Sequence, residues 1–203
     1  MRYLITQSLV SEWNYLMTCR DECKDDALTD FLNTLNRVPK ETTPEMQNGI
    51  DFENAVYATA AGLAPSRPAW EKGIRAVAEI IKGAPVQVKA QRELSVHGMD
   101  LLVFGIMDAL KAGVIYDVKF LNKGFGSVEL AGKYLDSPQH PAYFYIEPDA
   151  YEFQYLVSDG QDLYVEKYTP AITRPFPEIA EEFLAYLDAM NLFDTYKEKW
   201  TAF

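Results

Sequence analysis

Four charged side chains lie within apolar stretches of the sequence. Asp108 closes one apolar run, Asp117 and Lys119 interrupt the next, and Glu53 follows an aromatic residue in a segment with helical apolar spacing. A charged group in apolar surroundings is costly unless it is paired or binds a metal. Residues two apart on a strand point to the same face, so we expect Asp117 and Lys119 to project together.

Three carboxylates and one lysine are the groups that a magnesium phosphodiesterase site needs. Mg²⁺ prefers carboxylate and carbonyl oxygens and binds directly to phosphate. It lowers the pKa of an attacking water, and a nearby lysine stabilises the developing negative charge. A simpler alternative for Asp117 and Lys119 is an ion pair at the edge of a strand.

The elements before these residues are predicted to be helical. Apolar residues recur at helical spacing from Ser8 to about Val38, with a break near residues 20–26. Thr43 and Pro44 form a typical helix start, and that helix should end at Gly62. A further helix is expected from Pro68 to Ile81.

A sheet should follow these helices. Alternating and continuous apolar runs joined by short turns predict an antiparallel meander and then a hairpin. The meander strands are expected at Val86–Leu94, Leu101–Leu110 and Val114–Phe120, and the hairpin strands at Tyr151–Val157 and Leu163–Tyr168. Between them a helix should cover Ser127–Leu135 or Gln139–Tyr145, and an amphipathic helix should span residues 175–200. The predicted class is α/β of the α+β type, with a central mixed sheet flanked by helices.

Composition limits the classes of protein. With 203 residues, we expect a single domain over 1–203, with N-terminal helices within 8–82 and the C-terminal helix packed on the core. The longest strongly apolar stretch, Leu101–Met107, is too short to cross a bilayer, so no membrane association is expected. Only Cys19 and Cys23 are present, which fits a reducing, cytoplasmic compartment.

The charge is unfavourable for nucleic-acid binding if it is spread evenly. Nineteen Lys and Arg oppose thirty Asp and Glu, for a net charge of −11. The segment from Arg67 to Arg92 is locally basic, however, so a basic face remains open, as does an ordinary solvated helix face.

Several motifs together resemble the PD-(D/E)XK nuclease superfamily, especially its RecB-like and phage-recombination exonuclease branch. They are Glu53 after Gly49, Asp108 after Gly105, Asp117-Val118-Lys119, Gln139-x-x-x-Tyr143, and a helix start that contains Ser8. They follow the order of that family over most of the chain. The resemblance implies a restriction-endonuclease-like core and a metal-dependent deoxyribonuclease, more specifically an exonuclease in recombination, repair or phage DNA processing.

The resemblance also implies a role for each residue. Asp108 and Asp117 would bind Mg²⁺, or Mn²⁺ in its place, with the Val118 carbonyl as a further ligand. Glu53 would bind a second metal or an intervening water, and Lys119 would position the attacking water or offset charge. Gln139, Tyr143 and Ser8 would hold the DNA strand or support the site.

The chain departs from some relatives of that kind. Those that bind an iron-sulfur cluster use four cysteines, so no such cluster is expected with two. A zinc site would need both cysteines together with His97 and His140, and semi-buried thiols are the better interpretation.

The implied partners are linear DNA ends or single strands, a single-strand annealing or recombination protein, and a second copy of the chain in a homo-oligomer. The implied location is the cytoplasm of a bacterial or phage-infected cell. An endonuclease with the same chemistry is one alternative. The other, favoured by the negative charge, is a catalytically silent module of the same fold that binds DNA or a recombination partner.

Overall fold

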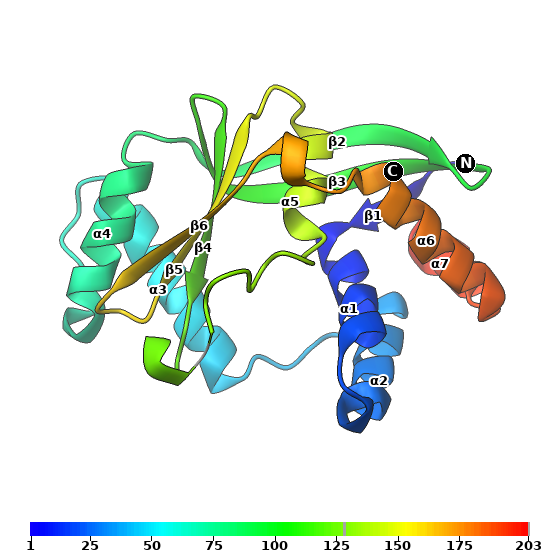
Figure 1. Ribbon diagram of the computed structural model, residues 1–203, viewed down its shortest axis with the longest axis horizontal. Coiled ribbons are helices and arrows are strands. Elements are labelled where there is room, and N and C mark those ends of the chain that lie inside the picture. The colour runs from blue at the N-terminus through cyan, green and yellow to red at the C-terminus, as the bar shows by residue number, and fades with distance from the viewer. Residues whose placement is uncertain (128, 203) are drawn as a thin grey trace.

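A computed structural model describes residues 1–127 and 129–202. It contains a six-stranded mixed sheet in the order β1-β3-β4-β5-β6, with β2 paired to β3. Helices flank the sheet (Figure 1), so the predicted class of a mixed sheet between helices is confirmed. None of the described helices is both long and apolar enough to cross a membrane.

The elements have the following bounds. The strands are β1 (Tyr3–Thr6), β2 (Val86–Val96), β3 (Met99–Lys111), β4 (Val114–Phe120), β5 (Glu152–Ser158) and β6 (Leu163–Tyr168). The helices are α1 (Gln7–Thr18), α2 (Lys24–Leu35), α3 (Pro44–Ala60), α4 (Glu71–Ile81), α5 (Gln139–Ile146), α6 (Phe176–Ala189) and α7 (Phe193–Lys199). The predicted strands and the helix start at Thr43, whose hydroxyl accepts a hydrogen bond from the Met46 N–H, are confirmed.

Strand β3 is long enough to pair with three other strands. On one edge it pairs with β2 in antiparallel register over almost its whole length. On the other edge, β1 pairs in parallel with Leu101–Phe104, and β4 pairs in antiparallel register with Ala109–Lys111. Residues 105–108 lie between these two pairings. The sheet therefore opens on that edge at the stretch that ends in Asp108.

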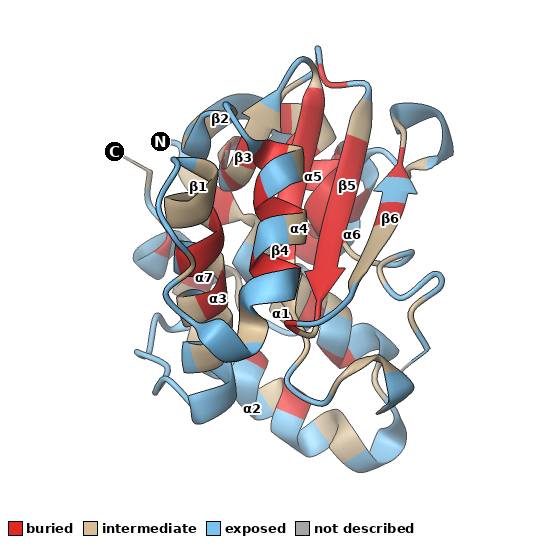
Figure 2. Ribbon diagram, turned by 90° about the vertical axis from the view of Figure 1, so that its left-hand side faces the viewer, coloured by how far each residue is buried: buried red, intermediate tan, exposed pale blue. Residues whose placement is uncertain are grey.

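Two apolar layers cover the sheet. Helices α3 and α4 pack on one face, against residues of β4 and β5 such as Val118 and Leu156. Helices α1, α5 and α6 pack on the other face, around Phe153 and Tyr155. Strands β4 and β5 are buried along most of their length (Figure 2), as central strands with helices on both faces should be.

The C-terminal segment differs from the expected single helix over 175–200. It forms α6 and α7, separated at Asn191, whose φ of 56° lies in the left-handed region. The N–H of Leu192 donates to the Leu187 carbonyl, and the N–H of Asn191 donates to the Asp188 carbonyl. This is a Schellman termination, for which asparagine is one of the few suitable residues.

The structure distinguishes between the two helix placements that the sequence allowed before β5. The helix covers Gln139–Ile146, whereas residues 131–136 form turns. Residue 128, which belongs to the other predicted helix placement, lies outside the described residues. Strand β1, which no sequence pattern predicted, places the start of α1 beside β3.

Candidate active site

Asp108 and Asp117 come together where β3 and β4 separate. The last pair on this side joins Ala109 to Tyr116, so Asp108 and Asp117 are the next residues on the two strands. The N–H of Val118 donates a hydrogen bond of 2.7 Å to Oδ2 of Asp108. Asp117 is only 3% exposed. The tight hairpin therefore delivers two carboxylates to one end of the β3–β4 pairing.

Lys119 and Gln139 contact the buried carboxylate of Asp117. The Lys119 Nζ lies 2.7 Å from Oδ2 of Asp117, and the amide of Gln139 donates to Oδ1. Within the part of the chain that the structure describes, Oδ2 has no partner of hydrogen-bond geometry. The ammonium of Lys119 therefore balances the charge of Oδ2, while this buried oxygen keeps an unused acceptor direction.

Glu53 reaches the same region from α3. Its neighbours Phe52 and Val56 anchor the helix in the core against β4. Oε1 of Glu53 accepts hydrogen bonds from the Tyr57 hydroxyl, at 2.6 Å, and from the Gln87 amide, at 2.9 Å. The carboxylate is near enough to Asp108 to perturb its pKa.

The three carboxylates form a region of concentrated negative charge. Burial, then the charge of Asp117, then that of Glu53 raise the pKa of Asp108 to about 8, although the Val118 N–H opposes the change. In the absence of a cation, Asp108 therefore holds its proton near neutral pH. A divalent cation would lower the pKa of Asp108 again, because it would balance the converging negative charges.

Lys119 is held as an ammonium. Burial lowers the pKa of Lys119, but the adjacent charges of Asp117 and Asp108 raise it by more, and the net direction is upward. At neutral pH this side chain can therefore donate hydrogen bonds and offset negative charge. It is poorly suited to accept a proton as a general base.

Helix α5 supports the open stretch of β3. The Tyr143 hydroxyl donates a 2.7 Å hydrogen bond to the carbonyl of Ile106. Its ring lies against Gly105, where a Cβ would stand 2.3 Å from Cε1 of Tyr143. Tyr143 is 5% exposed and Gln139 is 7% exposed. The structure thus places both residues as inner supports, one for the β3 backbone and one for Asp117.

Ser8 lies at the exposed start of α1. Thr6 is the helix cap, because its hydroxyl accepts from the Leu9 N–H, and the Ser8 hydroxyl lies 3.1 Å from that of Thr6. A groove of about 260 Å³ runs from this helix end to Tyr143. It is lined by Thr6, Gln7, Ser8, Phe104, Gly105, Ile106 and Tyr143.

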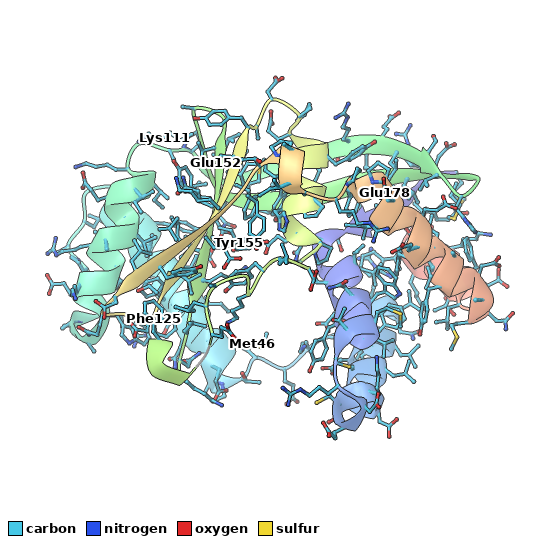
Figure 3. The ribbon with its side chains drawn as sticks, in the orientation of Figure 1. Met46, Lys111, Phe125, Glu152, Tyr155 and Glu178 are labelled. Carbon is cyan, nitrogen blue, oxygen red and sulfur yellow. The ribbon has the colours of Figure 1, made fainter. Side chains whose placement is uncertain are left out.

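Tyr155 links the site to the apolar layer between the sheet and helices α1, α5 and α6. It is paired in register with Asp117, is fully buried, and lies near the centre of the molecule (Figure 3). Its hydroxyl lies 3.1 Å from Nδ1 of His140, and its ring stacks on Tyr134 at 4.1 Å. Burial lowers the pKa of His140 to about 4, so this histidine is neutral at neutral pH and is part of the packed core.

Sequence reasoning overlooked Tyr57 and Gln87. Tyr57 follows Glu53 by four residues on a helix, and this spacing places the two side chains on one face. Gln87 had no such signal, because its contact depends on how β2 lies beside α3 and on an unusual backbone conformation, with φ of 53°.

Most of the basic residues between positions 67 and 92 form surface pairs. Arg67 pairs with Asp51, Lys72 with Asp162, Arg75 with Glu71 and Lys82 with Glu79, while Arg92 bonds to the carbonyl of Tyr145. The positive charge of the first four is thus offset locally by carboxylates.

Across residues 1–127 and 129–202, no three His, Cys, Asp or Glu side chains form a ready metal-binding group. Of the residues weighed for a zinc site, His97 bonds to Glu181, His140 bonds to Tyr155, and Cys19 and Cys23 are free thiols. The absence of a ready metal-binding group among the described residues also means that Glu53 does not close a compact three-ligand group with Asp108 and Asp117. A cation there would be held by the two strand carboxylates and by oxygens from solvent or substrate, as is usual for Mg²⁺.

Comparisons with known proteins bear on the fold. No protein-family model matches the chain, and no curated protein does. The solved structure of SSO0001 matches with a TM-score of 0.55 and 13% identity, over 94% of this chain and 77% of SSO0001. Rai1 from Scheffersomyces stipitis matches with a TM-score of 0.38 and 12% identity, over 93% of this chain and 61% of Rai1. The α/β architecture of this chain is thus similar to that of SSO0001, whereas the similarity to Rai1 is too low to define a shared fold.

Proposed function

We propose that this protein is a metal-dependent deoxyribonuclease that hydrolyses phosphodiester bonds. The observation that carries the proposal is that Asp108 and Asp117 come together where β3 and β4 separate. Beside it lies Oδ2 of Asp117, a buried oxygen that is paired with the Lys119 ammonium and keeps an acceptor direction unused. The resemblance of these motifs to those of PD-(D/E)XK nucleases supports the same proposal.

Asp108, Asp117 and the Val118 carbonyl would hold Mg²⁺, or Mn²⁺ in its place. Glu53 would act through a water or a second ion. The unused acceptor direction of Asp117 Oδ2 and the charge convergence at Asp108 fit a hard cation with oxygen ligands. When bound, such a cation lowers the pKa of a water and neutralises charge on the phosphate.

The chain's own groups hold and orient the reacting parts. The Lys119 ammonium, fixed by Asp117, can orient an attacking water and stabilise negative charge on the phosphoryl oxygens. Gln139 fixes Asp117 through Oδ1, so the cation would share Oδ2 with the Lys119 ammonium. Tyr143 fixes the carbonyl of Ile106 and thereby the end of β3 that carries Asp108.

The groove between Ser8 and Tyr143 is the proposed path of a DNA strand toward this site. The start of α1 and the Ser8 hydroxyl are suited to a backbone phosphate, because the first N–H groups of a helix point along its axis toward the groove end. Preference for linear ends or single strands, and therefore exonuclease action, rests on the family resemblance. The same is true of a recombination partner protein, a homo-oligomer and a role in phage DNA processing.

The second candidate is a catalytically silent module that binds DNA or a recombination partner. The observation that favours it is the net charge of −11, because an acidic surface weakens the grip on DNA. The local carboxylate pairing of the basic residues around α4 favours it as well.

Cleavage of linear and covalently closed circular DNA, with Mg²⁺ or with EDTA, separates these functions. We expect Mg²⁺-dependent loss of the linear form alone, abolished by Lys119→Ala. Cleavage of circles would indicate an endonuclease. If neither form is cut and Mg²⁺ leaves the melting temperature unchanged, the nuclease proposal fails and the silent module replaces it.

A further inference from the structure

Gln87 has a backbone conformation that its residue type rarely adopts. Its φ of 53° lies in the left-handed region, where a side chain with a Cβ is strained. The register pairs Val86 with Ala109 and Val88 with Met107, so Gln87 on β2 and Asp108 on β3 both lie between these two pairs. Strained residues persist where the surrounding structure holds them, and they concentrate at functional sites.

The side chain of Gln87 closes a three-membered hydrogen-bond network. Its Nε2 donates to Oε1 of Glu53 at 2.9 Å and to the Tyr57 hydroxyl at 2.9 Å. The Tyr57 hydroxyl in turn donates to the same Oε1 at 2.6 Å. The primary amide has two N–H donors and the hydroxyl both accepts and donates, so both amide N–H groups and the hydroxyl proton take part in the network.

The network fixes one carboxylate oxygen and not the other. Both hydrogen bonds to Glu53 end on Oε1, and neither involves Oε2. Glu53 and Tyr57 lie one turn apart on α3, whereas Gln87 comes from β2, the strand beside the one that carries Asp108. Gln87 therefore ties the helix carboxylate to the sheet at the level of the candidate metal ligands.

We infer that Gln87, together with Tyr57, is a positioning residue that holds Glu53 through Oε1 and leaves Oε2 available to a divalent cation or its water. The inference rests on the proposed function and adds residues that the family motifs do not include. The left-handed backbone at Gln87 is then retained because it aims the amide at Glu53.

A different role for Gln87 makes an opposite prediction. If the residue served only to bend the start of β2, glycine or asparagine would replace it without loss, because both adopt positive φ more readily. If it positions Glu53, both substitutions should keep or improve stability and still harm the site. Asparagine tests this strictly, since it retains an amide that is one methylene too short to bridge both partners.

The test compares Gln87→Gly, Gln87→Asn and wild type, with Gln47→Ala as a matched control. Gln47 also donates from its amide to a carboxylate on α3, at 2.8 Å, but the acceptor is the surface residue Asp51. We expect the Gln87 variants to melt at or above the wild-type temperature. Mg²⁺ affinity by calorimetry should fall about 10-fold, and kcat by about 10-fold or more, with KM for DNA unchanged. The control should match wild type throughout.

A crystal structure of Gln87→Gly gives a readout that is independent of metal and activity. We expect the Glu53 carboxylate to leave its wild-type position or to occupy several rotamers. An unmoved Glu53, or Gln87 variants that equal an active, metal-binding wild type, would overturn the inference alone. A wild-type protein that neither binds Mg²⁺ nor cuts DNA would overturn the proposed function, and the inference with it.

Discussion

Replacing Asp108 with asparagine removes one ionisable group from the carboxylate cluster and keeps its shape. The folded protein holds the Asp108 proton up to about pH 8, because burial and the charges of Asp117 and Glu53 raise the pKa of this carboxyl. The unfolded chain releases the proton near pH 4. Between these values the folded state binds more protons, so the unfolding free energy of the metal-free protein should fall as pH rises.

The size of this effect follows from the displacement of the pKa. Full ionisation of Asp108 in the folded state would cost at most about 5–6 kcal/mol. Asp108 is only partly buried and is coupled to its neighbours, so screening lowers this ceiling, and we expect about 2–3 kcal/mol between pH 5 and pH 9. Asp108→Asn should abolish most of this loss, because an amide does not ionise in this pH range. The fold should be retained, because the amide oxygen can still accept from the Val118 N–H.

The assay is urea unfolding in EDTA, followed by tryptophan fluorescence at a series of pH values. The variant should equal wild type at pH 5 and exceed it at pH 9. Asp100→Asn, which alters an exposed carboxylate on the same strand, should leave the wild-type pH dependence in place. Parallel pH profiles for wild type and Asp108→Asn would refute the idea that charge converges at this position.

Two further substitutions test the supports of the site. Gly105→Ala places a Cβ against the Tyr143 ring, so thermal unfolding should show a loss of about 1–3 kcal/mol, and unchanged stability would mean that this contact is not tight. Burial lowers the pKa of His140 to about 4, so the unfolded state takes up the proton first as pH falls below about 6.5. His140→Phe should therefore flatten the loss of stability between pH 6.5 and pH 4 by up to about 3 kcal/mol, and an equally steep acid limb would contradict the burial of a neutral histidine.

The local elements around the site were predictable from the sequence, because each has a strong local signal. Apolar alternation and tight turns located β2, β3 and β4, and the cap at Thr43 located α3. The proximity of Asp108 and Asp117 follows from a short hairpin, which fixes the partners of nearby residues.

The parts that sequence reasoning missed depend on contacts between distant segments. Strand β1 is four residues long and is stabilised by pairing with Leu101–Phe104, which no local pattern reveals. The end of α6 depends on a left-handed asparagine within an otherwise continuous amphipathic pattern. The role of Gln87 is of the same kind, since its partner Glu53 is 34 residues away on a helix.

The most direct test of the account is a crystal structure of the protein soaked with Mn²⁺, with anomalous diffraction to locate the ion. We expect a peak between Asp108 and Asp117, with the Val118 carbonyl among its ligands. Asp117→Asn should remove the peak without altering the hairpin. No peak in the wild type, or a peak only elsewhere, would contradict the claim that β3 and β4 together build a divalent-cation site.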